Sequence, residues 1–195
     1  MHKIRLVLAT NNQHKVSEIR KILPKSFELL TLNEAGLEAD LPETTGSIAG
    51  NAAQKAISVW KLAGCDCIAD DSGLEVDALG GKPGVDSAHF AGLPRNDDRN
   101  IVFLLDQMEG IQNRKANFKT VIALVKEGNV HLFEGKVNGV ITNSRRGTGG
   151  FGYDPVFIPE GFDKTFAELP EEIKNSISHR ANALKELHDF LKGGG

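Results

Sequence analysis

Short apolar runs alternate with segments of helical period in the first third of the chain, and this alternation constrains the fold more than any other feature. Residues 4–9 form a short apolar run rich in β-branched side chains, which is typical of a buried strand. A helix is expected next, with Val16, Ile19 and Leu23 on one face and Pro24 at its end. Strands followed by helices predict an α/β protein.

The rest of the chain continues with further predicted elements. Residues 33–46 are polar and contain proline and glycine, so we expect a loop. Glu127-Gly128-Asn129 separates two strand-like runs and predicts a hairpin. The other strands are predicted over 27–32, 67–69, 74–79, 116–125, 130–141 and 156–158. Helices are predicted over 47–63, with one apolar stripe of Ile48, Ala52, Ala56, Val59, Trp60 and Ala63, from a cap at Asn96 to Met108, in a short segment opened by Pro170, and from Ile177 to Leu191. A hairpin in the middle of an alternating pattern indicates a mixed sheet, and no linker divides the chain.

Charge and composition exclude several classes of partner. The 23 basic and 26 acidic residues give a formal net charge of -3, so a global electrostatic basis for binding a nucleic-acid polymer is absent. No apolar run approaches the roughly 18 residues that a membrane span needs, and the N-terminus predicts a first strand rather than a signal peptide. Cys65 and Cys67 are expected to be reduced thiols. We therefore expect a cytoplasmic protein with a small-molecule ligand and no membrane contact.

The first candidate site follows the first predicted strand. Thr10, Asn11 and Asn12 form a polar turn before a helix, and Lys15 lies in the first helical turn. A helix N-terminus offers unpaired N–H groups and the positive end of a dipole, which together favour an anion such as phosphate. Taken alone, these residues are more often simple helix caps.

The second candidate is an acidic pair. Asp70 and Asp71 lie at the predicted end of a buried strand, before Ser72 and Gly73, and consecutive strand residues point to opposite faces. A carboxylate there could hold Mg²⁺, which takes one or two carboxylates together with phosphate oxygens and waters. It could also orient or deprotonate a water. Turn formation explains the same tetrapeptide equally well.

A glycine-rich loop is the third candidate. Gly147, Gly149 and Gly152 match the dinucleotide-binding spacing, but Asp154-Pro155 and a strand follow where a helix is required, so that interpretation is rejected. Phe151 within the loop could stack on a planar base. Burial of the same ring in the core is equally compatible with the sequence.

The last candidate lies near the C-terminus. Ser178-His179-Arg180 opens a predicted helix one turn after Lys174, and these side chains could donate hydrogen bonds to base carbonyl oxygens. Alone, this segment is more typical of a helix start with solvated charges. Nothing in the chain matches the phosphate-binding P-loop G-x-x-x-x-G-K-[ST], which argues against the common kinase and GTPase designs.

Together these segments resemble the inosine triphosphate pyrophosphatase family over nearly the whole chain. The ordered motifs that carry the resemblance are A-T-N-N-x-x-K at 9–15, N-A-x-x-K-A at 51–56, A-D-D-S-G-L at 69–74, L-G-G-x-P-G-V at 79–85, G-T-G-G-F-G-Y-D-P-V-F at 147–157 and K-x-x-I-S-H-R at 174–180. Several motifs in one order are far more specific than any one of them.

The resemblance implies a role for each candidate residue. Asp71 matches the general base and metal-binding aspartate, and Asp70 supports the metal, Mg²⁺. The implied substrate-binding residues are Thr10, Asn12, Lys15 and Lys55 around the triphosphate, Asn11 and Ser72 in the substrate site, Phe151, Gly152, Tyr153 and Asp154 in the base-binding loop, and Lys174, His179 and Arg180 at the base edge.

The resemblance also implies a fold and an activity. The fold is an elongated mixed sheet with helices on both faces and two lobes around a central cleft, within one domain over 1–195. The activity is Mg²⁺-dependent hydrolysis of the non-standard purine nucleotides ITP, dITP and XTP to the monophosphate and pyrophosphate, by a homodimer. The alternatives are a Maf-like pyrophosphatase with a different base choice, or a non-catalytic nucleotide-binding module.

The chain departs from the family pattern at two places. Many members carry Glu immediately before the Asn-Ala of the second helix, whereas this chain has Gly50. Metal support is then expected from Asp70, Asp71, substrate oxygens or another acid such as Glu43. The family often has Ser-Ala-Arg-Tyr where this chain has Ser-Ala-His-Phe at 87–90, so contacts made by that arginine are not expected.

Overall fold

The computed structural model describes residues 3–10, 13–38 and 41–193. A six-stranded sheet has the order β2-β1-β3-β4-β5-β6. The strands are β1 (Ile4–Leu8), β2 (Phe27–Thr31), β3 (Cys67–Val76), β4 (Lys115–Lys126), β5 (Asn129–Ile141) and β6 (Phe157–Pro159). Because β1 is parallel to β2 and β3, whereas β5 and β6 are antiparallel, the predicted mixed sheet is confirmed.

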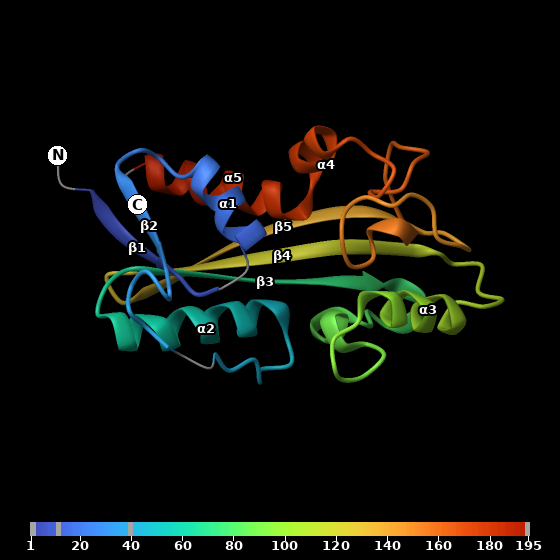
Figure 1. Cartoon of the computed structure of the whole chain (residues 1–195), viewed down its shortest axis with the longest axis horizontal. Coiled ribbons are helices and arrows are strands. Elements are labelled where there is room, and N and C mark those ends of the chain that lie inside the picture. Colours follow the sequence, from blue (N-terminus) through green and yellow to red (C-terminus); the bar gives the residue numbers. More distant parts are fainter. Residues whose placement is uncertain (1–2, 11–12, 39–40, 194–195) are drawn as a thin grey trace. The chain divides into compact units, whose positions relative to one another are not determined.

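Five helices accompany the sheet within the described ranges (Figure 1). They are α1 (Gln13–Ile22), α2 (Ile48–Ala63), α3 (Asp97–Gln107), α4 (Glu171–Ile177) and α5 (His179–Lys192). Short 3₁₀ turns cover Asp77–Leu79, Gly84–His89 and Asp154–Val156. The α/β class that the alternating pattern predicts is therefore confirmed.

The chain divides into two compact units that interleave in sequence. Unit 1 contains residues 1–71, 120–135 and 182–195, and unit 2 contains residues 72–119 and 136–181. Strands β3, β4 and β5 and helix α5 each contribute residues to both units.

Unit 1 packs helices on both faces of its strands. In Figure 1, α1 and the unit-1 part of α5 lie on one face, and α2 lies on the other. The buried core under α1 and α5 is aliphatic: Leu6, Leu8, Val16, Ile19, Leu29, Ile68, Ile122, Leu124, Ala183, Leu184 and Leu187. Helix α2 turns Ile48, Ala52, Ala56 and Val59 inward, as its predicted apolar stripe requires.

Unit 2 has a more aromatic core. Its buried residues are Leu74, Val76, Ile101, Leu104, Met108, Ala116, Phe118, Ile141, Tyr153, Val156, Phe157 and Phe166. Asn96 Oδ1 accepts a hydrogen bond from Arg99 N at 2.9 Å and caps α3, as predicted.

The turn between β4 and β5 belongs to unit 1. Glu127 and Gly128 in this turn both have positive φ, of 50° and 82°, which suits a tight hairpin.

The expected interruption of β3 at the acidic tetrapeptide is wrong. Strand β3 runs without a break through ten residues, from Cys67 to Val76, and Asp70 lies inside it. A buried charge is tolerated within a strand when an opposite charge pairs with it, and Lys15 lies 2.9 Å from Asp70.

The predicted last helix is also corrected. Ile177 belongs to α4, and extended backbone at Ser178 (φ -65°, ψ 153°) separates α4 from α5. Ser178 Oγ accepts a hydrogen bond from Ala181 N at 3.1 Å, so a new helix begins here. Pro170 precedes α4 as its N-cap rather than opening its first turn.

Cys65 and Cys67 are free thiols, as predicted, and Cys67 Sγ donates to Cys65 O at 3.1 Å. Burial raises the pKa of the Cys67 thiol to about 12. Among the helices of the described segments, none combines the length and the hydropathy of a membrane span.

Candidate active site

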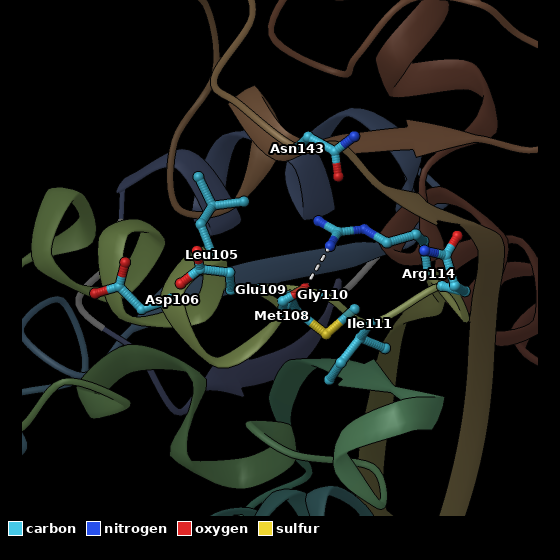
Figure 2. Close-up of a pocket in the computed structure, with 9 residues that line it drawn as sticks. Leu105, Asp106, Met108, Glu109, Gly110, Ile111, Arg114 and Asn143 are labelled. Carbon is cyan, nitrogen blue, oxygen red and sulfur yellow. Dashed lines mark hydrogen bonds between the residues drawn. The ribbon is translucent and has the colours of Figure 1, made fainter.

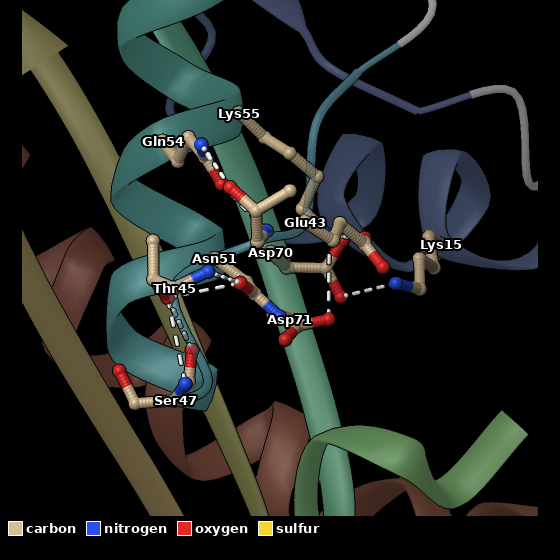
Figure 3. Close-up of polar contacts among 10 residues, drawn as sticks. Lys15, Glu43, Thr45, Ser47, Asn51, Gln54, Lys55, Asp70 and Asp71 are labelled. Carbon is tan, nitrogen blue, oxygen red and sulfur yellow. Dashed lines mark hydrogen bonds and ion pairs between the residues drawn. The ribbon is translucent and has the colours of Figure 1, made fainter.

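Two consecutive carboxylates of β3 contact lysines from two different helices of unit 1. The Asp70 carboxylate lies 2.9 Å from Lys15 Nζ of α1, and Asp71 Oδ1 accepts a hydrogen bond from Lys55 Nζ of α2 at 3.3 Å (Figure 3). The alternation of side chains along a strand sends neighbours to opposite faces, which is the arrangement that the sequence predicts for the pair.

A third carboxylate joins this group from the loop before α2. Glu43 Oε1 accepts a hydrogen bond from Lys55 Nζ, so Lys55 contacts both Glu43 and Asp71. The side chain of Lys55 is 8% exposed, whereas that of Glu43 is 49% exposed. A buried ammonium thus links the partly buried carboxylate of Asp71 to one that is more exposed to solvent.

The charges of this group perturb one another. Burial raises the pKa of Asp71, the positive charge of Lys55 partly offsets this, and the negative charge of Glu43 adds to the rise. For Lys55, burial opposes the charged form, but the charges of Asp71 and Glu43 outweigh it and raise the pKa. Perturbed and coupled groups of this kind are typical of functional sites.

A cavity of about 270 Å³ opens onto this charged group in unit 1. Its lining residues are Ala9, Thr10, Lys15, Leu32, Leu41, Glu43, Lys55 and Asp70. Thr10, Lys15 and Lys55 therefore come together as the sequence predicts, and both lysines can reach an anion placed there. The predicted ligands Asn11 and Asn12 lie outside the described residues.

Asp71 has an unused acceptor. Its Oδ2 atom is buried and accepts no hydrogen bond from the residues that the structure describes. Buried polar atoms are normally satisfied, so an orphaned carboxylate oxygen indicates a missing cation or water. The neighbouring Ser72 is half-buried in β3.

The glycine-rich loop of unit 2 is organised around Asp154. This buried side chain accepts a hydrogen bond from Phe151 N at 2.8 Å and another from Lys174 Nζ. Gly150 has φ +74°, and a Cβ there would lie 2.1 Å from Asp154 Oδ2, so only glycine fits. Burial raises the pKa of Asp154, and the charge of Lys174 offsets part of that rise.

Phe151 is not a core residue. Its side chain is 49% exposed, and Lys174 Nζ lies 4.7 Å from the ring centroid. The alternative of a ring inside the core is therefore wrong. An exposed aromatic face flanked by a cation is available to stack on a planar ligand.

His179 and Arg180 are buried at the start of α5. The His179 ring stacks on Phe118 with centroids 4.9 Å apart and an interplanar angle of 14°. Arg180 lies close enough to Asp154 for its charge to lower the pKa of that carboxyl, against the effect of burial. The expectation of solvated charges at this helix start is wrong, because both side chains are less than 10% exposed.

Tyr153 belongs to the predicted base-binding loop. Its side chain is buried in the core of unit 2, and its hydroxyl donates to Ser87 O at 2.8 Å. A ring and hydroxyl engaged in this way leave only the main chain of Tyr153 to contact a base. Gly152 N, next to it, donates to Asp97 Oδ2 at 3.0 Å.

The sequence did not indicate Asp97 as a site residue. It lies in the first turn of α3, 55 positions before Gly152, and it also accepts a hydrogen bond from Arg95 Nε at 3.0 Å. Its link to the glycine-rich loop is a long-range contact that no local sequence pattern indicates. Glu43 is one of the acids expected to support the metal, but no feature of the sequence indicates its contact with Lys55.

A cavity of about 510 Å³ elsewhere in unit 2 contains none of the predicted site residues (Figure 2). Arg114 lines it and donates to the main-chain oxygens of Met108, Ile141 and Thr142. A guanidinium committed to three carbonyl groups supports the loop structure, so this cavity does not compete with the charged group of unit 1.

Comparisons with known proteins cover nearly the whole chain. It is 52% identical to the dITP/XTP pyrophosphatase of Flavobacterium johnsoniae over 188 residues, covering 96% of this chain and 98% of the other. It is 53% identical to the dITP/XTP pyrophosphatase of Porphyromonas gingivalis, with 96% and 97% covered. The solved structure of the Staphylococcus aureus Ham1 protein superposes with a TM-score of 0.93 at 38% identity, covering 98% of this chain and 100% of the other.

These matches confirm the resemblance that the ordered motifs indicate. They also confirm the mixed sheet with flanking helices, because the superposed structure shares that fold. Residues 6–190 match the model of one family, so the chain belongs to the Ham1 family.

Proposed function

We propose that this protein hydrolyses non-standard purine nucleoside triphosphates, such as ITP, dITP and XTP, to the monophosphate and pyrophosphate. The observation that carries the proposal is the Asp70–Asp71 pair with Lys15 and Lys55 beside the cavity of unit 1. The names of the relatives that match over the full length support the same activity.

The residues of unit 1 fit Mg²⁺ as a cofactor. Asp71 offers a buried oxygen without a hydrogen-bond donor among the described residues, and Asp70 precedes it in the strand. The described part of the chain contains no cluster of three or more His, Cys, Asp or Glu side chains placed to hold a metal ion together. Mg²⁺ does not need one, because one or two carboxylates combine with substrate phosphates and waters. When bound, the ion neutralises charge on the phosphate oxygens.

The chain's own residues then divide the chemistry. Lys15 and Lys55 hold phosphate oxygens, and Asp71 orients a water and accepts its proton. The water oxygen forms a bond to the α-phosphorus while the bond between that phosphorus and the leaving pyrophosphate breaks. No covalent intermediate is required.

Base choice falls to the residues of unit 2. Phe151 stacks on the purine, while Lys174, His179 and Arg180 supply hydrogen-bond donors to carbonyl oxygens at its edge. Adenine presents an amino group where hypoxanthine and xanthine present a carbonyl, so ATP would leave donors facing a donor. Mismatched buried polar groups cost about 1–3 kcal/mol each. We expect ITP, dITP and XTP to be preferred over ATP by orders of magnitude.

We also propose that the protein acts as a cytoplasmic homodimer. This proposal follows from the resemblance. Because His89 replaces the arginine that the family often carries, the dimer of this chain needs a direct test. Light scattering on the purified protein distinguishes a dimer from a monomer, and a strictly monomeric active enzyme would exclude the dimer.

One assay tests the function. Pyrophosphate release is measured with ITP, dITP, XTP, ATP, GTP and a pyrimidine triphosphate, with Mg²⁺ and after chelation. The proposal predicts Mg²⁺-dependent release from the first three. Equal rates on all substrates would refute base selection, a preference for the pyrimidine nucleotide would favour the Maf-like alternative, and binding without release would favour a nucleotide-binding module.

The variant Asp71→Asn tests the mechanism within that assay. It keeps the shape of the side chain but removes the proton acceptor, so turnover should fall by a factor of about 10² to 10⁴ while ITP still binds. The matched control is Asp77→Asn, an exposed acid just after β3. Unchanged turnover in Asp71→Asn would remove Asp71 from its proposed role.

A further inference from the structure

The loop before α2 is attached to that helix by two side-chain amides. Thr44 N donates to Gln54 Oε1, and Gln54 Nε2 donates back to Thr44 Oγ1, both at 2.9 Å. Thr45 N and Thr45 Oγ1 both donate to Asn51 Oδ1, at 3.1 and 2.9 Å (Figure 3). The two residues that directly follow Glu43 are therefore fixed to α2 through main chain and side chain.

Gly50 is the feature of α2 that lets the loop approach. A Cβ built at this position would lie 2.2 Å from Thr45 Oγ1 and 2.7 Å from both Thr45 Cβ and Ser47 Oγ. These separations are far below van der Waals contact, so any side chain at position 50 would displace Thr45. Glycine is a poorer helix former than alanine. Gly50 therefore lowers the intrinsic stability of α2 but allows the loop to pack against the helix.

The anchored loop carries Glu43 to Lys55. A half-exposed ion pair holds a long side chain only weakly, because solvent screens the attraction and fixing the side chain costs conformational entropy. The contact with Lys55 therefore does not by itself set the position of Glu43. The hydrogen bonds at Thr44 and Thr45 do so, because they fix the backbone immediately after it.

We propose that Asn51 and Gln54 are positioning residues that hold Glu43 against Lys55, and that position 50 must be glycine because Thr45 occupies the space of a side chain there. The inference rests on the proposed function, in which Lys55 binds phosphate beside Asp71. When the anchor is lost, Glu43 moves away and Lys55 keeps its contact with Asp71 but loses that with Glu43. Misplacement of a catalytic group by about 1 Å can reduce rates by about 10²-fold.

Amide exchange in the nucleotide-free and metal-free protein tests the anchor without reference to activity. Gln54→Ala removes the acceptor of Thr44 N, so NMR should show exchange of this amide at least tenfold faster than in the wild type. The matched control is Ser58→Ala, one turn further along α2, whose hydroxyl bonds only within the helix in the described contacts. Unchanged exchange at Thr44 in Gln54→Ala would overturn the anchor.

Kinetics test what the anchor does. Gln54→Ala and Gly50→Ala should each lower kcat/KM for ITP by about tenfold or more, whereas Ser58→Ala should not. Gly50→Ala separates positioning from general stability, because alanine favours the helix and the melting temperature should hold while the rate falls.

The outcomes separate the two proposals. An inactive wild-type protein overturns the proposed function and this inference with it. An active wild type whose Gln54→Ala and Gly50→Ala variants keep full kcat/KM overturns the inference alone. A fall in kcat/KM that accompanies an equal loss of stability in both variants assigns these residues to folding and also overturns it.

Discussion

Asp70 and Asp71 are neighbours in β3, yet their carboxylates contact lysines from different helices, Lys15 of α1 and Lys55 of α2. The side chain of Asp70 is 1% exposed and that of Asp71 is 13% exposed. The strand thus presents one charge to each face, and each helix supplies a compensating lysine. Each acid therefore has its own ion pair with one lysine, and the two pairs can be changed one at a time.

Removal of Lys15 should destabilise the protein. Lys15→Met leaves the Asp70 carboxylate buried without this ammonium, and loss of one partner of a buried pair costs about 3–5 kcal/mol. We expect the free energy of unfolding at pH 7 to fall by about 3 kcal/mol, measured by urea denaturation. Lys61→Met, at an exposed position of α2, is the control and should change it by less than about 0.5 kcal/mol. Equal stability of the two variants would contradict a stabilising Lys15–Asp70 pair.

The pKa of Asp71 should respond in opposite directions to its two neighbours. Burial raises this pKa, the charge of Lys55 lowers it and the charge of Glu43 raises it. Lys55→Met removes the positive charge and should therefore raise the pKa of Asp71 further. Glu43→Gln removes a negative charge and should bring the pKa of Asp71 down towards its ordinary value.

Carboxyl ¹³C NMR titration of the metal-free protein measures both shifts directly. The acidic limb of kcat/KM should move with them, to higher pH in Lys55→Met and to lower pH in Glu43→Gln, because the general base must be deprotonated. The control is Glu34→Gln, in an exposed pair with Arg20 outside the cavity, which should leave the Asp71 titration in place. Shifts of the same sign in both variants would exclude the proposed coupling.

Local patterns in the sequence predicted what depends on local geometry. The period of two along β3 placed Asp70 and Asp71 on opposite faces, and the capping role of Asn96 followed from its residue type and position. The same approach failed where tertiary contacts override propensity. The Asp-Ser-Gly segment favours a turn, but pairing of Asp70 with Lys15 keeps it within a strand.

Contacts between distant positions carried no signal in the sequence. The hydroxyl of Tyr153 donates a hydrogen bond to the main-chain oxygen of Ser87, 66 positions away. An aromatic residue of the base-loop motif is therefore part of the core of unit 2. The position of Glu43 depends on Thr45, which occupies the space that a Cβ at position 50 would fill. No pattern of residue types in the sequence reveals this contact. The family motifs indicate the charged groups, but which of these groups touch depends on tertiary contacts between distant segments.

Phe151 should contribute to substrate affinity rather than to folding. Its ring is 49% exposed, so Phe151→Ala removes little buried surface. Stacking of a base on an aromatic side chain is worth about 1–3 kcal/mol, so KM for ITP should rise by about 10- to 100-fold. Phe162→Ala, at another exposed phenylalanine of unit 2, is the matched control and should leave KM unchanged. Equal effects of the two changes would exclude a stacking role for Phe151.

Asp97 should act on base choice through the glycine-rich loop. Its carboxylate accepts the Gly152 N–H, and although burial opposes the charge, the contacts with Arg95 and Gly152 keep the pKa of Asp97 below its ordinary value. Asp97→Asn keeps an acceptor oxygen but loses the charge, so a charge-assisted hydrogen bond worth about 1.5–3 kcal/mol becomes a weaker, neutral one.

The loop residue after Phe151 is then held less firmly, and the ratio of kcat/KM for ITP over ATP should fall by about tenfold. The adjacent Asp98→Asn is the sharpest control that the chain offers. Asp98 forms a solvent-exposed pair with Arg145 at 2.6 Å, and such pairs contribute about 0–1 kcal/mol. Because the two acids are neighbours in the first turn of α3, both variants change the helix dipole interaction and the net charge equally. A loss of selectivity in Asp97→Asn alone therefore isolates the hydrogen bond to Gly152, and the same loss in both variants would assign the effect to charge instead.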